Sequence, residues 1–135
     1  MREIKFRAWD KELKEWTNYS ISNINGNVID FYNKESGFWE SDQEGERFIL
    51  CQYTGLKDKT GKEIYEGDIV REIGDDYTPV YTKGIYMALN IEQLKYPEEH
   101  RQFSTQFNVV WKNGCEILGN IYENPELLKE LTNDN

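Results

Sequence analysis

The stretch from Gln52 to Val70 reads QYTGLKDKTGKEIYEGDIV and spaces three glycines among acidic residues and lysines. Glycine tolerates the backbone conformations that tight turns need. The spacing therefore predicts a structured loop over residues 55–67, with a short extended piece at 63–65. The loop leads into an apolar strand predicted over residues 68–73. A chain that turns in this way into short strands is typical of a small β-barrel.

The sequence before this stretch is dominated by short strand patterns. Ile4, Phe6 and Ala8 alternate with their neighbours as in a half-buried strand. Asn25-Gly26 suits the two central positions of a type I′ turn and predicts a hairpin. Residues 33–46 are polar and broken by glycine, and we expect a loop there that could include an edge strand. The expected strands are residues 4–9, a strand that begins at Trp16, the hairpin arms 21–24 and 28–32, and residues 48–53.

The sequence after this stretch predicts further strands and a hairpin. Residues 74–79 are expected to form a loop, and residues 84–89 a strand. Asn113-Gly114 predicts a second hairpin, with residues 107–112 and 115–122 as its arms. Residues 90–104 stay open: one helical turn fits the pattern, and Pro97 would end it.

The end of the chain has the clearest helix signal. Asn124 is a good N-cap, and Pro125 suits the first helical position. Leu127, Leu128 and Leu131 form one apolar stripe. The stripe is too short to be stable alone, so the helix must dock on the barrel. The pattern predicts one mainly β domain over residues 1–135. It divides into an N-terminal β subdomain, 1–54, a small β-barrel, 55–123, and a C-terminal helix, 124–132.

The composition limits the function classes. The net charge is −9, and the acidic residues are spread along the whole chain. An acidic field repels phosphates, so a nucleic-acid partner is disfavoured. Cys51 and Cys115 lack metal-ligand spacing, and His100 stands alone in a polar stretch. No signal peptide or membrane-spanning pattern is present, so we expect a cytoplasmic protein with reduced thiols and no membrane association.

No sequence motif in the chain indicates a catalytic site. Glu66-Gly67-Asp68 resembles a carboxylate pair, but Gly67 indicates a turn, in which Asp68 accepts hydrogen bonds from nearby backbone N–H groups. The run Asp58-Lys59-Thr60-Gly61-Lys62-Glu63 lacks the alternating oxygen ligands of a calcium loop. Phosphate-binding glycine motifs and nucleophile motifs are absent. We therefore expect no enzyme activity, no cofactor and no metal.

Three phrases of the sequence resemble the YopX family of small phage and prophage proteins. They are REIKFRAWD at residues 2–10, the central phrase at 52–70, and ILGNIYENPELL at 117–128. The resemblance implies a C-terminal barrel similar to the Src-homology-3 fold, preceded by an N-terminal β-hairpin subdomain. It also implies a phage-encoded cytoplasmic protein of unassigned function. It carries no catalytic or binding residues over, and the stretches 17–47 and 74–107 hold no family phrase.

The candidate binding residues are Asp75, Asp76, Tyr77 and Tyr81, which follow the first predicted barrel strand. In Src-homology-3 domains the corresponding loop and its tyrosines bind proline-rich peptides. Our first hypothesis is a module that binds a host or phage protein. The alternatives are an acidic decoy that mimics DNA and a small barrel that binds nucleic acid by aromatic stacking. Exposed strand edges also leave a homo-oligomer open.

Overall fold

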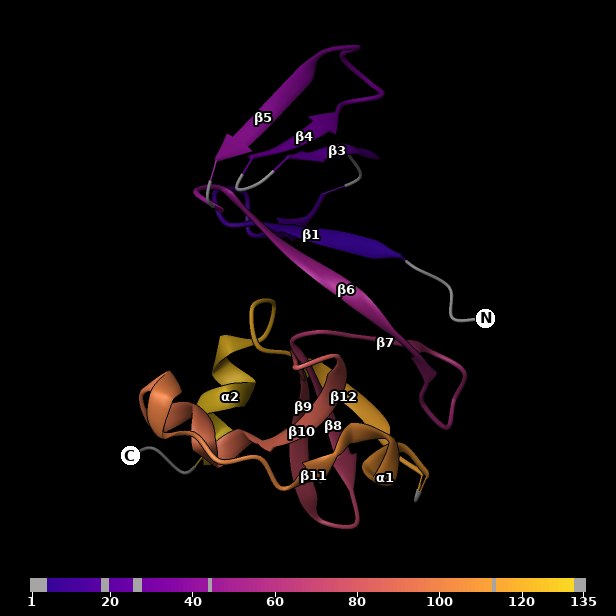
Figure 1. The fold of residues 1–135 in the computed structure, drawn as a ribbon, viewed down its shortest axis with the longest axis vertical. Helices are drawn as coiled ribbons and strands as arrows, with labels where there is room; N and C mark the ends of the chain where they lie inside the picture. The colour runs from indigo at the N-terminus through magenta and orange to yellow at the C-terminus, as the bar shows by residue number, and fades with distance from the viewer. Residues whose placement is uncertain (1–4, 18–19, 26–27, 44, 113, 133–135) are drawn as a thin grey trace. The chain divides into compact units, whose positions relative to one another are not determined.

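The computed structural model describes residues 5–17, 20–25, 28–43, 45–112 and 114–132, and Figure 1 labels its elements. Backbone contacts divide the chain into two compact units. The N-terminal unit is Lys5–Gln52, and the C-terminal unit is Tyr53–Asn135 together with Met1–Ile4. Gly26 of the first predicted turn and Asn113 of the second lie outside the described residues.

The N-terminal unit contains two small antiparallel sheets. In one, β1 (Phe6–Asp10) lies between β2 (Glu15–Trp16) and the first half of β6 (Phe48–Lys57). The other has the order β3 (Ser20–Asn25), β4 (Val28–Tyr32), β5 (Trp39–Gln43). The rings of Phe31 on β4 and Phe48 on β6 lie 4.5 Å apart between centroids. The two sheets therefore share one apolar core, which also contains Ala8.

The C-terminal unit is a curled half-barrel sheet with short helices. Its five strands have the order β11-β10-β9-β8-β12, and the second half of β6 pairs with β7 (Glu63–Tyr65). The sheet strands are β8 (Asp68–Glu72), β9 (Asp75–Thr82), β10 (Ile85–Asn90), β11 (Thr105–Gln106) and β12 (Glu116–Asn120). The helices are η1 (Ile91–Lys95), η2 (Glu98–His100), α1 (Phe107–Lys112) and α2 (Pro125–Thr132).

The core of this unit confirms a mainly β fold built around a few large side chains. Ile64, Val70, Tyr86, Phe107 and Val110 are buried together, with Ala88 and Cys115 beside them. They come from β7, β8, β10 and α1. Residues far apart in sequence thus close one core, as expected for a small β domain.

The predicted turn at Glu66-Gly67-Asp68 is confirmed. Gly67 has φ +87°, and Oδ2 of Asp68 accepts the Tyr65 N–H at 2.7 Å. A Cβ on Gly67 would lie 2.9 Å from the Tyr122 ring. Position 67 therefore requires glycine for two reasons: the positive φ and the lack of room for a Cβ beside Tyr122.

The turn between β6 and β7 is organised by one carboxylate. Asp58 is buried and accepts four hydrogen bonds: from the N–H groups of Thr60, Lys62 and Ile117, and from the Thr60 hydroxyl. Because Ile117 lies on β12, Asp58 joins the loop to the sheet. The Asp58 carboxylate, which lies in the run that resembled a calcium loop, therefore accepts its hydrogen bonds from N–H and O–H groups of the protein itself.

The prediction of a loop over residues 74–79 is wrong. β9 begins at Asp75, and Glu72 pairs with Asp75, so only Ile73 and Gly74 form the turn. Pro79 had suggested a loop. Pairing between β8 and β9 ends at Tyr77, so the missing N–H of Pro79 removes no hydrogen bond to β8.

The prediction of a strand over residues 107–112 is also wrong, because this segment is α1. Phe107 and Val110, three residues apart, are buried, whereas Val109 and Trp111 are exposed. That spacing follows the helical period. The indole N–H of Trp111 donates to the Lys57 carbonyl at 2.7 Å, which fixes the helix to β6.

Three further predictions of elements match the structure: the edge strand, the helical turn and the C-terminal helix. The edge strand expected within residues 33–46 is β5, and the helical turn in the open segment is η1, which ends before Pro97. The C-terminal helix is α2. Asn124 precedes it, but its Oδ1 accepts from the Asn120 N–H at 3.0 Å. Within the described residues, no helix combines the length and apolar character needed to cross a membrane.

Candidate binding surface

The turn between β8 and β9 presents an exposed apolar side chain at its tip. It consists of Ile73 at φ +44° and Gly74 at φ +84°. Two consecutive residues with positive φ between paired strands are typical of a type I′ turn. The Ile73 side chain is 83% exposed. The hairpin therefore holds a large aliphatic group out in solvent.

Isoleucine is a poor residue for the first position of this turn. A branched Cβ clashes with the backbone at positive φ, so such residues are outliers there, whereas asparagine is well tolerated. The β9–β10 turn, at the opposite end of β9, has the same geometry with Lys83 at φ +50° and Gly84 at φ +87°. The strain at Ile73 is not compensated by burial, and uncompensated strain is most often found at functional positions.

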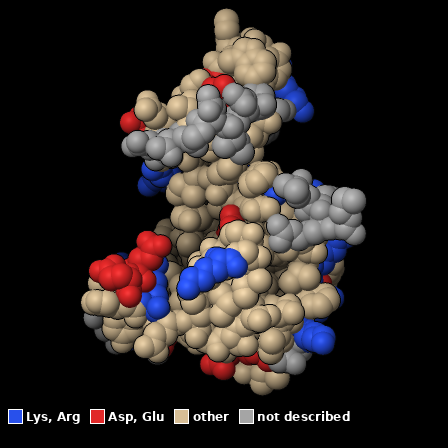
Figure 2. Space-filling model, viewed as in Figure 1, with Lys and Arg blue, Asp and Glu red and all other residues tan. Residues whose placement is uncertain are grey.

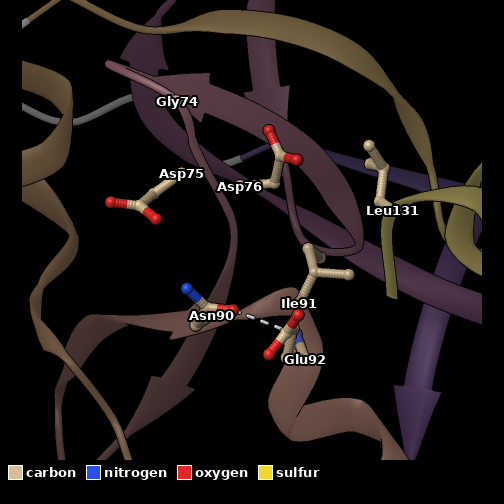
Figure 3. Close-up of a pocket in the computed structure, with 7 residues that line it drawn as sticks. All are labelled: Gly74, Asp75, Asp76, Asn90, Ile91, Glu92 and Leu131. Carbon is tan, nitrogen blue, oxygen red and sulfur yellow. Dashed lines mark hydrogen bonds between the residues drawn. The ribbon is translucent and has the colours of Figure 1, made fainter. Parts of the chain in front are cut away.

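A hollow of about 210 Å³ lies directly beside this tip. Figure 3 shows Asp75 and Asp76 from the start of β9 and Asn90 and Glu92 from the β10–η1 junction around it. The floor is completed by Gly74, Ile91 and, from α2, Leu131. Asn90 caps η1, since its Oδ1 accepts the Glu92 N–H at 3.0 Å (Figure 3).

The carboxylates around the hollow differ in their pairing. Asp76 is bound by Arg71 through two hydrogen bonds, Nε to Oδ1 at 2.8 Å and Nη2 to Oδ2 at 3.1 Å. In the described part of the chain, no basic side chain forms an ion pair with Asp75 or Glu92. These two carboxylates give the hollow its negative charge.

The structure separates the four residues that the sequence singled out. Asp75 and Asp76 both line the hollow, but Tyr77 packs against the core of the unit. Burial of Tyr77 raises the pKa of its phenol, and the charges of Asp75 and Glu72 raise it further. Tyr81, four residues along β9, has a half-exposed ring that meets the Tyr86 ring edge to face, with 5.0 Å between their centroids. The four do not form one surface.

No group of three or more His, Cys, Asp or Glu side chains in the described part of the chain is placed to hold a metal ion. His100 is exposed in η2. Burial of the Cys115 thiol raises its pKa, and the nearby charge of Asp58 adds to this, so the thiolate form is disfavoured.

Sequence reasoning missed Ile73, because the residue was assigned to the end of an apolar strand. The signal was present in Glu72-Ile73-Gly74-Asp75: a Gly flanked by acidic residues marks a turn. An isoleucine at a turn position is then the unusual feature.

Comparison with known proteins identifies the family. The sequence profile described as YopX protein matches residues 5–129. The chain belongs to the YopX family. Its fold is similar to the crystal structure of protein EF1440 from Enterococcus faecalis, with a TM-score of 0.57 and 28% sequence identity over 95% of this chain and 99% of that chain. A comparison with curated proteins gave no match.

Proposed function

We propose that this YopX-family chain is a non-enzymatic module that binds a host or phage protein through the β8–β9 hairpin. The observation that carries the proposal is Ile73, which is strained and 83% exposed. In a complex, the Ile73 side chain would enter an apolar pocket of the partner. Burying one such side chain contributes about 1.5–3 kcal/mol to association.

The charge beside Ile73 suggests what surrounds the partner's pocket. Asp75 and Glu92 lie next to the tip without a basic partner among the described residues. A partner with lysines or arginines around its pocket would meet these carboxylates, and complementary charge would favour the correct orientation. The expected partner surface is an apolar pocket with a basic rim.

The proposal includes the setting in which the module acts. A phage or prophage origin, a cytoplasmic location and closure of the C-terminal sheet into a Src-homology-3-like barrel are all part of it. The likeness to YopX proteins supports them. In this setting the partner is a protein of the bacterial host or of the phage.

The test is affinity purification of the full chain from the bacterial host during phage infection. Wild type is compared with Ile73→Asn, which keeps the turn and removes the apolar tip. Lys83→Asn changes the matching position of the β9–β10 turn and is the control. We expect a specific partner with wild type and Lys83→Asn and at least a tenfold loss with Ile73→Asn. Equal recovery with Ile73→Asn would show that the tip is not the contact.

A DNA-mimic decoy is the second candidate, because the net charge of −9 favours a basic partner. On the face shown in Figure 2, however, Lys and Arg side chains lie among the described Asp and Glu side chains, which argues against a phosphate-like row. A decoy would bind a nucleic-acid enzyme in a salt-sensitive manner, with DNA as competitor. Direct nucleic-acid binding predicts a gel shift at low salt, and the net charge makes it the weakest of the three.

A further inference from the structure

A strand edge in the N-terminal unit offers a second binding surface, separate from the β8–β9 hairpin proposed above. We infer that the free edge of β5 accepts an extended, basic segment of a partner protein as an additional strand. The sheet order is β3-β4-β5, so within the described residues β5 pairs only with β4. Such an edge presents N–H and C=O groups that a further strand can bind.

The register identifies which groups face outward. Pairs in an antiparallel ladder alternate between bonded and non-bonded. The Asn33 N–H donates to the Phe38 carbonyl at 3.0 Å, so the bonded positions continue at Glu40 and Asp42. Trp39, Ser41 and Gln43 then direct their backbone groups away from β4. In agreement, the Gln43 carbonyl accepts the Glu46 N–H, outside the ladder.

The edge lacks the bulge, lysine and proline that protect many such strands, and the charges that it carries, Glu40 and Asp42, are acidic. The pairing of β4 with β5 is regular over five residue pairs, whereas the opposite pairing of β3 with β4 has a register shift. β5 contains neither lysine nor proline. A regular strand without these residues is a ready template for another strand.

Exposed aromatic rings beside the edge would cover the added strand. Phe38 is 72% exposed and Trp39 62% exposed. The Trp39 ring lies 5.0 Å from the ring of Tyr32 on β4, on the outer face of the sheet. An apolar side chain of the incoming strand, placed opposite Trp39, would pack on this pair.

Charge selects a basic partner over a second copy of the chain. Residues 33–46 contain one lysine and five acidic residues, a net charge of −4. Glu40 on β5 already forms an ion pair, with its Oε1 3.6 Å from Nη1 of Arg47, and its buried Oε2 accepts no hydrogen bond within the described part of the chain. Antiparallel pairing of two β5 strands about Ser41 would place Glu40 opposite Asp42, and like charges in that position are destabilising. Lysines or arginines in an added strand would instead be attracted by the net negative charge of residues 33–46.

The test uses the full chain and fluorescein-labelled octapeptides at low ionic strength. The probe alternates valine and lysine; one control alternates valine and glutamate, and another is the basic peptide with alternate backbone nitrogens methylated. Fluorescence anisotropy measures binding. We expect the basic peptide to bind at least tenfold more tightly than either control. Equal binding of the methylated peptide would show that backbone pairing is not involved and would overturn the inference.

Two variants at one position isolate the backbone group. The Ser41 hydroxyl donates to Asp30 at 2.6 Å, and this bond is lost in both Ser41→Ala and Ser41→Pro. Only proline also removes the outward N–H, and both variants have the same charge. We expect at least tenfold weaker peptide binding for Ser41→Pro than for Ser41→Ala. Similar affinities, with both proteins folded by circular dichroism, would contradict the inference.

Amide hydrogen exchange gives a second measurement that needs no variant. The N–H groups of Trp39, Ser41 and Gln43 should exchange fast in the free protein and slow at least tenfold with the basic peptide. Those of Glu40 and Asp42 should be protected in both states. A dimer that dissociates on Ser41→Pro would instead identify a second copy as the occupant. Because Ile73→Asn should leave peptide binding unchanged, failure here is distinguishable from failure of the hairpin proposal.

Discussion

Asn120 donates a hydrogen bond from Nδ2 to Oδ1 of Asp68 at 3.0 Å, and both side chains are buried. Asp68 ends the turn that precedes β8, and Asn120 ends β12. The Ile121 N–H also donates to the Gly67 carbonyl at 2.9 Å, and Asn120 Oδ1 accepts the Tyr122 N–H at 2.8 Å. Two of the sequence phrases shared with the YopX family are therefore joined in space.

This pair predicts that Asn120→Asp is strongly destabilising at neutral pH. The change would place two buried carboxylates within hydrogen-bond distance and remove the donor to Asp68. Breaking a buried polar pair in this way costs about 3 kcal/mol. Urea unfolding at pH 7 and pH 5 measures the effect, which should be smaller at pH 5 because one carboxylate can accept a proton. Asn33→Asp, at a partly exposed turn residue whose Oδ1 accepts from Glu35 and Ser36, should change stability by less than about 0.5 kcal/mol.

A comparison of two glycines separates backbone strain from crowding. Gly61 and Gly67 have φ +93° and +87°, so alanine at either position costs about 1–2 kcal/mol. A Cβ at Gly61 would meet nothing within 4 Å, whereas one at Gly67 would lie 2.9 Å from Tyr122. Gly67→Ala should lose about 1–3 kcal/mol more than Gly61→Ala in urea unfolding. Equal losses would mean that Tyr122 moves aside.

The local contact of Asp68 with the backbone was predictable from sequence. A carboxylate after a glycine in a turn accepts nearby backbone N–H groups, and the bond from Tyr65 confirms this. Asn120 is 52 residues away. Local patterns do not report which distant side chain reaches a buried carboxylate, so this partner needed the structure. The same limit applies to Asp58 and Ile117.

The two wrong element assignments have physical causes. The segment FNVVWK contains β-branched and aromatic residues at spacings that fit either period, and burial of Phe107 with Val110 decides for the helix. Asp75-Asp76 with Pro79 resembled a loop because these residues are depleted in strands. The Arg71 side chain compensates Asp76 across the β8–β9 pair. As a result, the candidate site shifted from tyrosines in a loop to the tip of a hairpin.

The pH dependence of the free energy of unfolding should reflect the ionisation of the Asp58 carboxyl. Burial alone would raise its pKa, but the hydrogen bonds from Ile117, Thr60 and Lys62 outweigh burial and hold the pKa below the ordinary 3.8. A carboxylate with a lowered folded-state pKa contributes stability that is present above the unfolded value and lost as pH falls through the folded one. Urea unfolding should therefore show falling stability as pH drops through about 3.8 and below.

Asp58→Asn gives the matched measurement. It should lower stability at pH 7 by about 2 kcal/mol, because charge-assisted hydrogen bonds are lost. Its pH slope below about pH 4 should be shallower than that of wild type. Some slope should remain, since Asp10 also has a lowered pKa: burial opposes the shift, and the hydrogen bonds from Arg47, Leu13 and Glu12 together with the Arg47 charge outweigh it. An unchanged slope would assign the acid sensitivity to other groups.

The exposed tip predicts a substitution that stabilises the protein. Ile73→Asn places a residue that tolerates positive φ in the first position of the type I′ turn, and the 83% exposed side chain gives up almost no burial. The free energy of unfolding should rise by about 1 kcal/mol, since positive φ costs a branched residue about 1–2 kcal/mol. Lys83→Asn should give a smaller gain, because lysine is not branched at Cβ. Urea unfolding of both variants measures the difference. A loss of stability in Ile73→Asn would mean that Ile73 makes a folded-state contact, and its exposure would then not be evidence for a partner.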